Sequence, residues 1–265
     1  MIKIYVASFN RASDGALSKL IKKLFRENMW TDDYKKADYI LACGDRKETF
    51  DFVLERYRKN KKIIHLWAGE ISQGTQDEVY RHAMTLMSCI QLCTNDTAKA
   101  RVKSLCKSVG KVYNVATIGN VMLDNMEINE HNIPNKPYDL ILYNPPTTSS
   151  DYEIRKEIEK IDYMKNENYI WIVPNGDYGS YLVNKYSNTK NLPRERFLGL
   201  LKHCDKFITN SSCQYYEAPF LIDKEKIISI GERNAERESK YADMTIPNAS
   251  KNIMKVFRSL DDRKI

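Results

Sequence analysis

The residues with the clearest potential for chemistry lie close together in one short segment of the first half of the chain. Glu70, Asp77 and Glu78 supply three carboxylates, and Arg81 and His82 follow within about one helical turn of Glu78. Carboxylates and histidines can take or give protons, and an arginine can hold an anion or fix a carboxylate. The segment therefore predicts acid–base chemistry. A well-capped surface helix with an ion pair is an equally open interpretation of the spacing alone.

The elements around this segment predict where its side chains lie. An apolar run, Ile63–Trp67, is typical of a buried strand, and residues 75–78 fit a capping box that starts a helix over 76–87. The acidic, arginine and histidine side chains of this helix are three or four residues apart and share one face. The carboxyl end of a strand is where open α/β sheets bind ligands, so we expect a site there.

Composition indicates a globular protein and argues against a membrane-spanning or disulfide-rich one. The chain has 265 residues, of which 42% are hydrophobic and 29% charged, enough for one large or two compact domains. No apolar run reaches the roughly 20 residues of a membrane span, and the chain opens as a strand rather than a signal peptide. Six scattered cysteines form no C-x-x-C pair, so we expect reduced thiols, no metal site and a cytoplasmic protein. The net charge of +7 is spread along the chain and only weakly favours polyanions.

Strand-like and helix-like runs alternate throughout, which predicts βαβ units and parallel sheets. A polar stretch at 121–137 with two prolines is the best domain boundary. We therefore expect an α/β protein of two Rossmann-like domains facing a cleft, at 1–125 and 137–246, with a last helix at 247–265 that packs back on the first. Other expected helices include 16–27 and 215–221.

Two turns are candidates for binding phosphate. The turn 10–15 precedes the first helix and carries Arg11, and Asn210, Ser211 and Ser212 lie between a strand and a helix in the second half. Backbone N–H groups at a helix start favour anions, and Glu217 could accept hydrogen bonds from a ribose. Plain helix capping by Asn and Ser is the alternative. The chain has neither G-x-G-x-x-G nor a P-loop motif, so neither chemistry is indicated.

Several segments, taken in order, resemble the UDP-N-acetylglucosamine 2-epimerase family, especially its hydrolysing members. The resemblance runs from about residue 38 to residue 240. The matching segments are Gly44-Asp45-Arg46, Ala68-Gly69-Glu70 through Asp77-Glu78 and Arg81-His82-Ala83 to Thr85, Gly119-Asn120 with Leu123-Asp124-Asn125, Asn175-Gly176-Asp177-Tyr178-Gly179-Ser180, Asn191-Leu192-Pro193 with Phe197–Leu201, and Asn210-Ser211-Ser212 with Glu217-Ala218-Pro219.

This resemblance implies a glycosyltransferase B fold and a reaction that needs no cofactor. Family members remove the proton at C2 of a UDP-sugar and expel UDP, and the hydrolysing ones then add water to release N-acetylmannosamine. The resemblance implies catalytic roles for Asp45, Glu70, Asp77, Glu78, Arg81 and His82. It implies substrate contacts for Arg11, Asn144, Asn175, Asp177, Ser180, Asn210, Ser211, Ser212, Glu217 and Arg233.

The chain departs from the family pattern in three places. Asn144-Pro145 stands where the family has His-Pro, and asparagine cannot shuttle protons near neutral pH. The N-terminal domain is shortened between the first helix and Ala37, and Trp67-Ala68 makes the loop before Glu70 bulkier. UDP-sugar binding is therefore a firmer expectation than the outcome of the reaction.

Three functions remain open at this point. The first is an epimerase acting on UDP-N-acetylglucosamine or a close relative. The second is a glycosyltransferase with a bulky acceptor, for which nucleic acid would suit the net charge. The third is a nucleotide-sugar binder without turnover. We expect no membrane partner, and the sequence leaves a homodimer open.

Overall fold

The computed structural model describes residues 1–9, 11–174, 176–234 and 246–262. These residues divide by their contacts into two compact units, and each unit is described by itself. The first contains residues 1–9, 11–70, 77–125 and 246–262. The second contains residues 71–76, 126–174 and 176–234. No helix in the described ranges is long and apolar enough to span a membrane.

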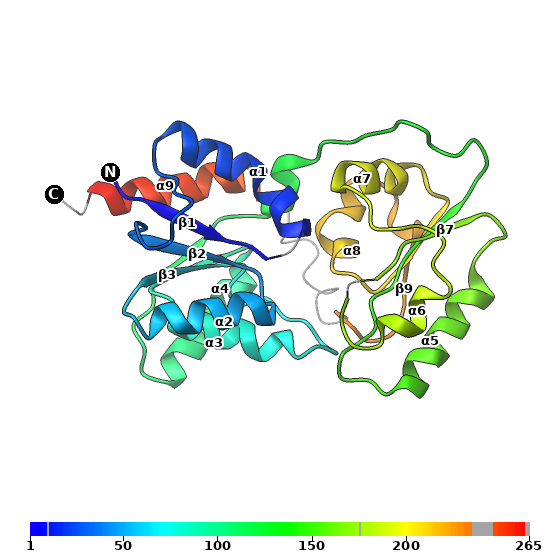
Figure 1. Ribbon diagram of the computed structural model, residues 1–265, viewed down its shortest axis with the longest axis horizontal. Helices are drawn as coiled ribbons and strands as arrows, with labels where there is room; N and C mark the ends of the chain where they lie inside the picture. The colour runs from blue at the N-terminus through cyan, green and yellow to red at the C-terminus, as the bar shows by residue number, and fades with distance from the viewer. Residues whose placement is uncertain (10, 175, 235–245, 263–265) are drawn as a thin grey trace. The chain divides into compact units, whose positions relative to one another are not determined.

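The first unit is built on a five-stranded parallel sheet (Figure 1). Its strands are β1 (Ile4–Ala7), β2 (Tyr39–Cys43), β3 (Lys62–Leu66), β4 (Ile90–Cys93) and β5 (Val115–Thr117), in that spatial order. Its helices are α1 (Arg11–Arg26), α2 (Lys47–Tyr57), α3 (Asp77–Met87), α4 (Asp96–Ser108), the short 3-10 helix η1 (Val121–Asn125) and α9 (Ala249–Asp262). All carboxyl ends of the strands therefore lie at one edge, which collects the loops that carry the site.

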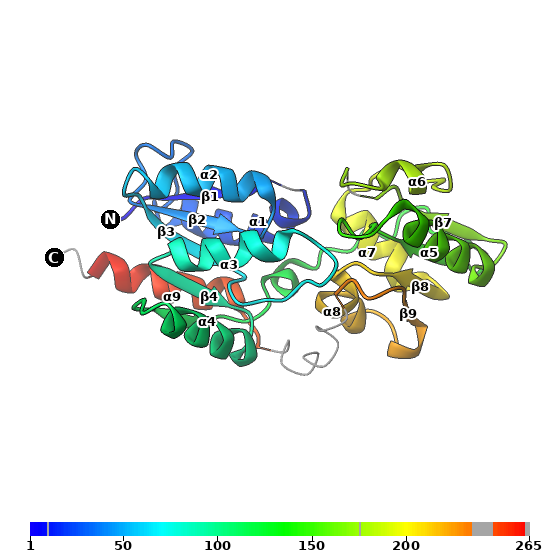
Figure 2. The same cartoon turned by 90° about the horizontal axis from the view of Figure 1, so that it is seen from below.

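Alternating side chains explain how the helices cover this sheet. On β3, Ile64 and Leu66 pack with α1 and α9, whereas Ile63 packs with α2 and α3 on the opposite face (Figures 1 and 2). Further along that second face, α4 packs on Cys93 through Ala98 and Val102. Strands buried on both faces read as continuous apolar runs, which is why the sequence pattern identifies them.

Helix α9 is held in the first unit at its start and along its length. Ile253 and Phe257 are fully buried in the core shared with α1. The Asp124 carboxylate accepts the backbone N–H of Ala249 at 3.1 Å and that of Ser250, two groups that have no partner inside the helix. Lys19 of α1 donates to the Asp124 carbonyl at 2.8 Å. The Leu123-Asp124-Asn125 motif thus contributes a helix cap in this fold.

The second unit has a four-stranded parallel sheet in the order β7-β6-β8-β9. Its strands are β6 (Asp139–Leu142), β7 (Tyr169–Trp171), β8 (Lys206–Thr209) and β9 (Ile227–Ser229). One face is covered by α5 (Asp151–Met164) and α6 (Ser180–Asn184), and the other by α7 (Arg194–His203). The short helices α8 (Cys213–Tyr216), η2 (Ala218–Phe220) and η3 (Lys224–Lys226) complete it.

The polar stretch after η1 is fastened to α7. Asn129 donates its backbone N–H to the Glu195 carbonyl at 2.9 Å, and Arg196 donates to the carbonyls of His131 and, at 2.7 Å, Asn132. Only a glycine fits at position 199, because a Cβ there would lie 1.9 Å from the Asn129 carbonyl oxygen. The segment therefore runs against α7 as part of the second unit.

The α/β fold with parallel sheets is confirmed, and three elements differ from expectation. Helix α1 begins at Arg11 rather than at Ala16, so it includes Gly15 despite a cost of about 1 kcal/mol relative to alanine. The helix expected over 215–221 is wrong. Helix α8 ends at Tyr216 and a separate 3-10 helix follows, since Pro219 has no N–H to continue an α-helix. Short α6 was not expected at all.

Candidate functional site

The loop after β3 presents Glu70 through an unusual backbone path. Trp67 has φ of 65° and Gly69 has φ of 77°, a left-handed conformation that is uncommon for a bulky residue and natural for glycine. A Cβ on Gly69 would lie 2.3 Å from the Ala98 carbonyl oxygen, so the loop presses directly on the start of α4. Arg101 of α4 donates to the Gly69 carbonyl. The loop is thus fixed against α4 immediately before Glu70.

Arg81 is the centre of a buried ionic cluster in the first unit. Its side chain is 2% exposed, yet it reaches three partners on three segments. It donates to the carboxylates of Asp45 and Glu78 and, at 3.2 Å, to the Glu70 carbonyl. A buried guanidinium needs such partners, because an unpaired charge in the interior is strongly destabilising. The cluster therefore ties the loops after β2 and β3 to α3.

Two atoms beside this cluster are buried without a hydrogen-bond partner in the described chain. They are Oε1 of Glu70, a residue that is 5% exposed, and Nδ1 of His82. The other ring nitrogen of His82 lies 2.7 Å from Glu78. The Cys93 thiol neighbours Glu70, and burial, with the Glu70 charge as the next cause, raises the pKa of Cys93 to about 12. Glu70 thus holds an unused acceptor in a protected position.

The structure brings together most of the residues expected to be catalytic. Asp45, Glu78, Arg81 and His82 form one connected network, with Glu70 joined to it through its backbone carbonyl. Asp77 is the first residue of α3 and is half-buried. The carboxylates of Asp45 and Glu78 therefore contact Arg81 directly, and Glu70 and Asp77 bring two more carboxylates to the adjoining segments.

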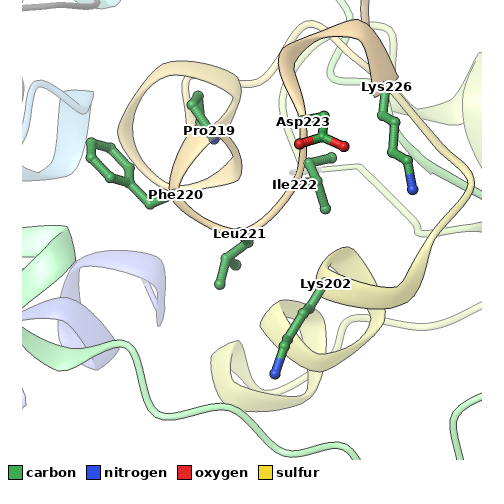
Figure 3. A pocket seen from close by; sticks show the side chains of 7 residues that line it. All are labelled: Lys202, Pro219, Phe220, Leu221, Ile222, Asp223 and Lys226. Atoms are coloured by element: carbon green, nitrogen blue, oxygen red, sulfur yellow. The ribbon is translucent and has the colours of Figure 1, made fainter.

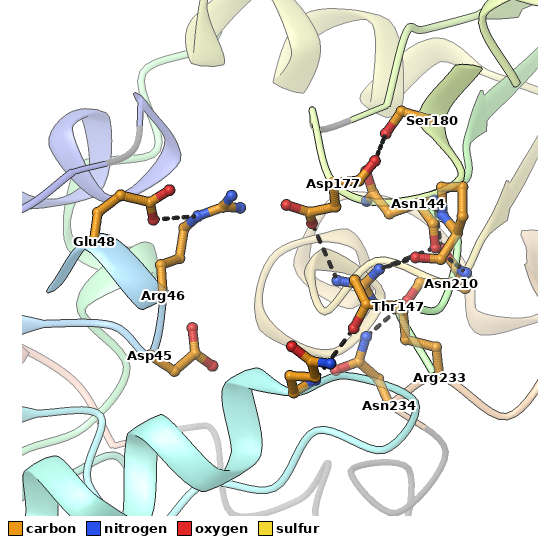
Figure 4. Close-up of polar contacts among 12 residues, drawn as sticks. Asp45, Arg46, Glu48, Asn144, Thr147, Asp177, Ser180, Asn210, Arg233 and Asn234 are labelled. Carbon is orange, nitrogen blue, oxygen red and sulfur yellow. Dashed lines mark hydrogen bonds and ion pairs between the residues drawn. The ribbon is translucent and has the colours of Figure 1, made fainter. Parts of the chain in front are cut away.

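In the second unit, the ends of β6 and β8 are joined through two asparagines (Figure 4). The side chain of Asn210 accepts the backbone N–H of Asn144 at 2.8 Å and donates to its carbonyl at 2.7 Å. Arg233 donates to the carbonyls of Asn144 and Pro145 at 3.1 and 2.7 Å, and lies 4.0 Å from the Asp177 carboxylate. Ser180 donates to the Asp177 carbonyl at 2.5 Å. These expected substrate residues form one connected group.

The turn after β8 offers fewer free donors than its sequence indicates. The Ser211 N–H donates to Thr209 at 2.9 Å, and the Cys213 N–H to the Ser211 hydroxyl at 3.4 Å. Helix α8 has only four residues. Among the described residues, the N–H and hydroxyl of Ser212 have no partner. Ser212 is therefore the group in this turn that is best placed to donate to an anion.

Glu217 lies at the end of α8, not inside a helix as expected, and it has a partner that the sequence did not indicate. Its side chain is 7% exposed, and one oxygen accepts from Nε and Nη2 of Arg194 at 2.9 and 2.6 Å. Burial raises the pKa of Glu217, whereas the charge and hydrogen bonds of Arg194 lower it. The pairing joins the start of α7 to α8. The nearness of Asn-Leu-Pro-Arg and Glu217 arises only in the fold.

Two expected binding residues lie outside the description. Nothing is described for Asn175 or for the side chain of Arg11. The described ranges contain no cluster of histidine, cysteine and carboxylate side chains that could hold a metal ion. An open hollow of about 330 Å³ in the second unit is lined by other residues, namely Lys202, Pro219, Phe220, Leu221, Ile222, Asp223 and Lys226 (Figure 3). None of them belongs to the two groups above.

The fold and the two groups of polar residues define the class of protein. The chain is an α/β protein of two parallel-sheet units, with acid–base residues at the strand ends of one and amide, hydroxyl and arginine groups at those of the other. It belongs to the UDP-N-acetylglucosamine 2-epimerase family, whose model matches residues 4–265.

Individual relatives are distant and longer. A GDP/UDP-N,N'-diacetylbacillosamine 2-epimerase (hydrolyzing) of Campylobacter jejuni is 26% identical over 225 residues, covering 76% of this chain and 58% of the relative. The polysialic acid biosynthesis protein P7 of Escherichia coli is 27% identical, covering 86% and 63%. The UDP-N-acetylglucosamine 2-epimerase of Neisseria meningitidis is 26% identical, covering 83% and 63%. The chain thus spans about three fifths of the length of these relatives.

Solved structures share the fold. The S. aureus protein MnaA, solved with UDP, superposes with a TM-score of 0.70 at 16% identity, covering 99% of this chain and 88% of that one. The N. meningitidis UDP-GlcNAc 2-epimerase, solved with UDP-GlcNAc, gives 0.68 at 14% identity, covering 97% and 100%. At these identities the likeness concerns the fold alone.

Proposed function

We propose that this chain is a UDP-sugar 2-epimerase of the hydrolysing type, acting on UDP-N-acetylglucosamine or a close relative. The observation that carries the proposal is the buried cluster in which Arg81 binds Asp45 and Glu78 beside the unpartnered oxygen of Glu70. The family and the relatives, two of whose names state a hydrolysing or UDP-N-acetylglucosamine 2-epimerase, support it.

The reaction needs a base, stabilisation of positive charge and a leaving group. In the proposed step a carboxylate takes the C2 proton, the C2–H electrons form a C1=C2 double bond, and the C1–O electrons leave with UDP. Water then adds its oxygen to C1 while C2 regains a proton on the opposite face, giving N-acetylmannosamine. The electronegative group around Asp45, Glu70, Asp77 and Glu78 suits a sugar that becomes positively charged.

Within this proposal, Glu70 is the candidate base, because its free oxygen is held in a water-poor position by a fixed loop. Asp45 and Asp77 are the candidates for returning the proton, and Arg81 orients the Asp45 carboxylate. Nε2 of His82 lies 2.7 Å from the Glu78 carboxylate, and both residues lie on the face of α3 that carries Arg81. A positioned acid or base of this kind contributes about a hundredfold to ten-thousandfold.

The nucleotide would bind to the second unit. Ser212 offers an N–H and a hydroxyl to a phosphate, and Arg233 offers a charge beside Asp177. The free oxygen of Glu217 would accept from the ribose hydroxyls, since Arg194 occupies the other one. Arg11, Asn175 and Ser180 remain candidates for substrate contacts on the family resemblance alone.

Asn144 is the residue that most limits this proposal. Its backbone is held on both sides by Asn210, so its side chain starts from a fixed position. An amide there can hydrogen-bond a substrate but cannot carry a proton. The acid–base work would then fall on the carboxylates of the first unit. The transferase alternative is not favoured, because the family and two of the relatives named above are 2-epimerases by name.

Proton NMR of UDP-N-acetylglucosamine with the protein in deuterated water tests the proposal. We expect release of UDP and of N-acetylmannosamine that carries deuterium at C2. Glu70→Gln should lower the rate by at least about a hundredfold, while Glu55→Gln, on the exposed face of α2, should leave it unchanged. Line broadening of the substrate without turnover or exchange at C2 would instead indicate a binder and refute the epimerase proposal for this substrate.

A further inference from the structure

A second histidine lies buried behind the acid–base cluster, on the strand that leads to Glu70. His65 of β3 is completely buried and faces the side of the sheet covered by α2 and α3. Its Nε2 lies 3.1 Å from the Gly44 carbonyl oxygen, and its Nδ1 lies 3.0 Å from the Thr85 hydroxyl. The first partner directly precedes Asp45 in the chain. The second lies one turn after Arg81 on α3.

The partners of the ring determine how its protons are arranged. A carbonyl oxygen only accepts, so Nε2 carries a hydrogen and donates it to Gly44. Burial lowers the pKa of His65 to about 4, so the ring is neutral near pH 7 and Nδ1 accepts the Thr85 hydroxyl. That hydroxyl also donates to the Arg81 carbonyl at 3.0 Å, so its single hydrogen is shared between the two acceptors. The ring is thus bonded at both nitrogens and has no nitrogen left for chemistry of its own.

The two bonds of His65 span the same two segments as the ion pair between Asp45 and Arg81. The turn after β2 is anchored at Gly44, which has φ of 86° and no neighbouring atom within 4 Å of a Cβ position. Among the described residues, no atom packs against Gly44 on this side, so the hydrogen bond from His65 to its carbonyl is a specific tie between this turn and β3. Helix α3 is anchored one turn beyond Arg81. The His65 ring therefore bonds to the segments that carry both partners of the ion pair, next to Asp45 and one turn after Arg81.

We propose that His65 is a positioning residue that sets the Asp45 carboxylate against Arg81 by tying the Gly44–Asp45 turn to α3. The proposal rests on the function proposed above in that Asp45 is taken as an acid–base group. His65 itself touches no substrate. Its neighbour on β4, Gln91, holds α3 in a different way, by donating to the carbonyls of Thr85 and Ser88 at 3.3 and 2.8 Å. Gln91 makes no contact with the turn, so it is a matched control.

Glutamine and asparagine at position 65 can distinguish the contribution of the Gly44 hydrogen bond from that of the Thr85 hydrogen bond. A glutamine at position 65 places its amide nitrogen near the position that Nε2 of His65 occupies, so it can still donate a hydrogen bond to the Gly44 carbonyl. An asparagine is shorter and can reach only the Nδ1 position, where its oxygen can accept from Thr85. We therefore compare His65→Gln, His65→Asn and Gln91→Leu. If the Gly44 bond positions Asp45, glutamine preserves function and asparagine does not.

The experiment measures two quantities on each variant that remains folded by circular dichroism. The first is steady-state release of UDP from UDP-N-acetylglucosamine. We expect His65→Asn to lower kcat by about tenfold with little change in KM, the loss of a hydrogen bond that matters mainly in the transition state. We expect His65→Gln and Gln91→Leu to keep kcat within about threefold of the natural protein.

The second quantity is backbone hydrogen–deuterium exchange in the peptide that covers residues 44–48, which does not depend on turnover. We expect exchange there to rise about tenfold in His65→Asn and to stay near the natural level in His65→Gln. Equal exchange in the natural protein and His65→Asn, or equal loss of kcat in His65→Asn and Gln91→Leu, would overturn the proposal. Altered exchange with no turnover even in the natural protein would support the positioning role and refute the proposed function.

Discussion

Replacing Arg194 with methionine should destabilise the second unit, and the size of the effect should depend on pH. Glu217 is 7% exposed at its side chain and has Arg194 as its partner at 2.6 Å. Methionine fills most of the space of the arginine stem but leaves the carboxylate buried and unpaired. Breaking a buried ion pair in this way costs about 3–5 kcal/mol at neutral pH.

The stability of the Arg194→Met variant depends on pH because burial and Arg194 act in opposite directions on the pKa of Glu217. Burial raises the pKa of Glu217 above 4.5, and Arg194 opposes that rise, so the variant raises it further. A carboxyl group whose folded pKa is raised loses stability as pH rises from its unfolded value through the folded one. Protonation therefore relieves the variant at acidic pH. The loss of stability relative to the natural protein grows by about 1.4 kcal/mol for each pH unit between the folded pKa of Glu217 in the natural protein and its higher folded pKa in the variant.

Urea denaturation at pH 5, 6, 7 and 8 checks this reasoning. We expect the loss in free energy of unfolding to be about 1 kcal/mol at pH 5 and about 3 kcal/mol or more at pH 7. Arg194→Met combined with Glu217→Gln should remove most of the pH dependence and recover part of the stability. Arg196→Met, on the same helix but bonded only to loop carbonyls, should cost less than about 1 kcal/mol at every pH. A penalty in Arg194→Met that does not change with pH would refute the explanation.

Two further predictions concern stability. Asp124→Ala removes both hydrogen bonds at the start of α9 and should lower the stability of the first unit by about 1–2 kcal/mol, with Asp124→Asn intermediate, as thermal melting would reveal. Gly199→Ala places a Cβ against the carbonyl of Asn129 and should cost about 1–3 kcal/mol in chemical denaturation, while Gly176→Ala, with open space around it, should change little. An unchanged Gly199→Ala would mean that residues 126–133 do not lie on α7.

Much of the fold could be predicted because its signals are local. Parallel strands buried on both faces read as apolar runs, and the helices between them read as amphipathic segments, so elements such as β3 and α3 were expected within about two residues. The errors came from effects beyond the periodic pattern. Helix α1 extends five residues further toward its start, through residues whose types are typical of a turn. One proline divides the expected helix at 215–221.

The candidate site divides in the same way. The helix face with Glu78, Arg81 and His82 follows from spacing, and its contacts are present in the structure. The partners supplied by other elements could not be read in this way. Arg194 is 23 residues from Glu217, and His65 is 21 residues from Gly44 and 20 from Thr85. No periodicity connects such residues, because the order of strands in the sheet brings them together.

The depth of Arg81 also bears on why this cluster exists. Apolar residues of similar volume are often as stable as a buried ion pair or more so. Stability alone therefore does not explain why the Arg81 guanidinium, 2% exposed, lies between two carboxylates. Nor does it explain the unpartnered oxygen of Glu70 beside them. Perturbed and incompletely satisfied polar groups of this kind concentrate at functional sites. The unpartnered oxygen of Glu70 is the part of the cluster that stability explains least, and it is the atom to which the proposed function assigns the proton transfer.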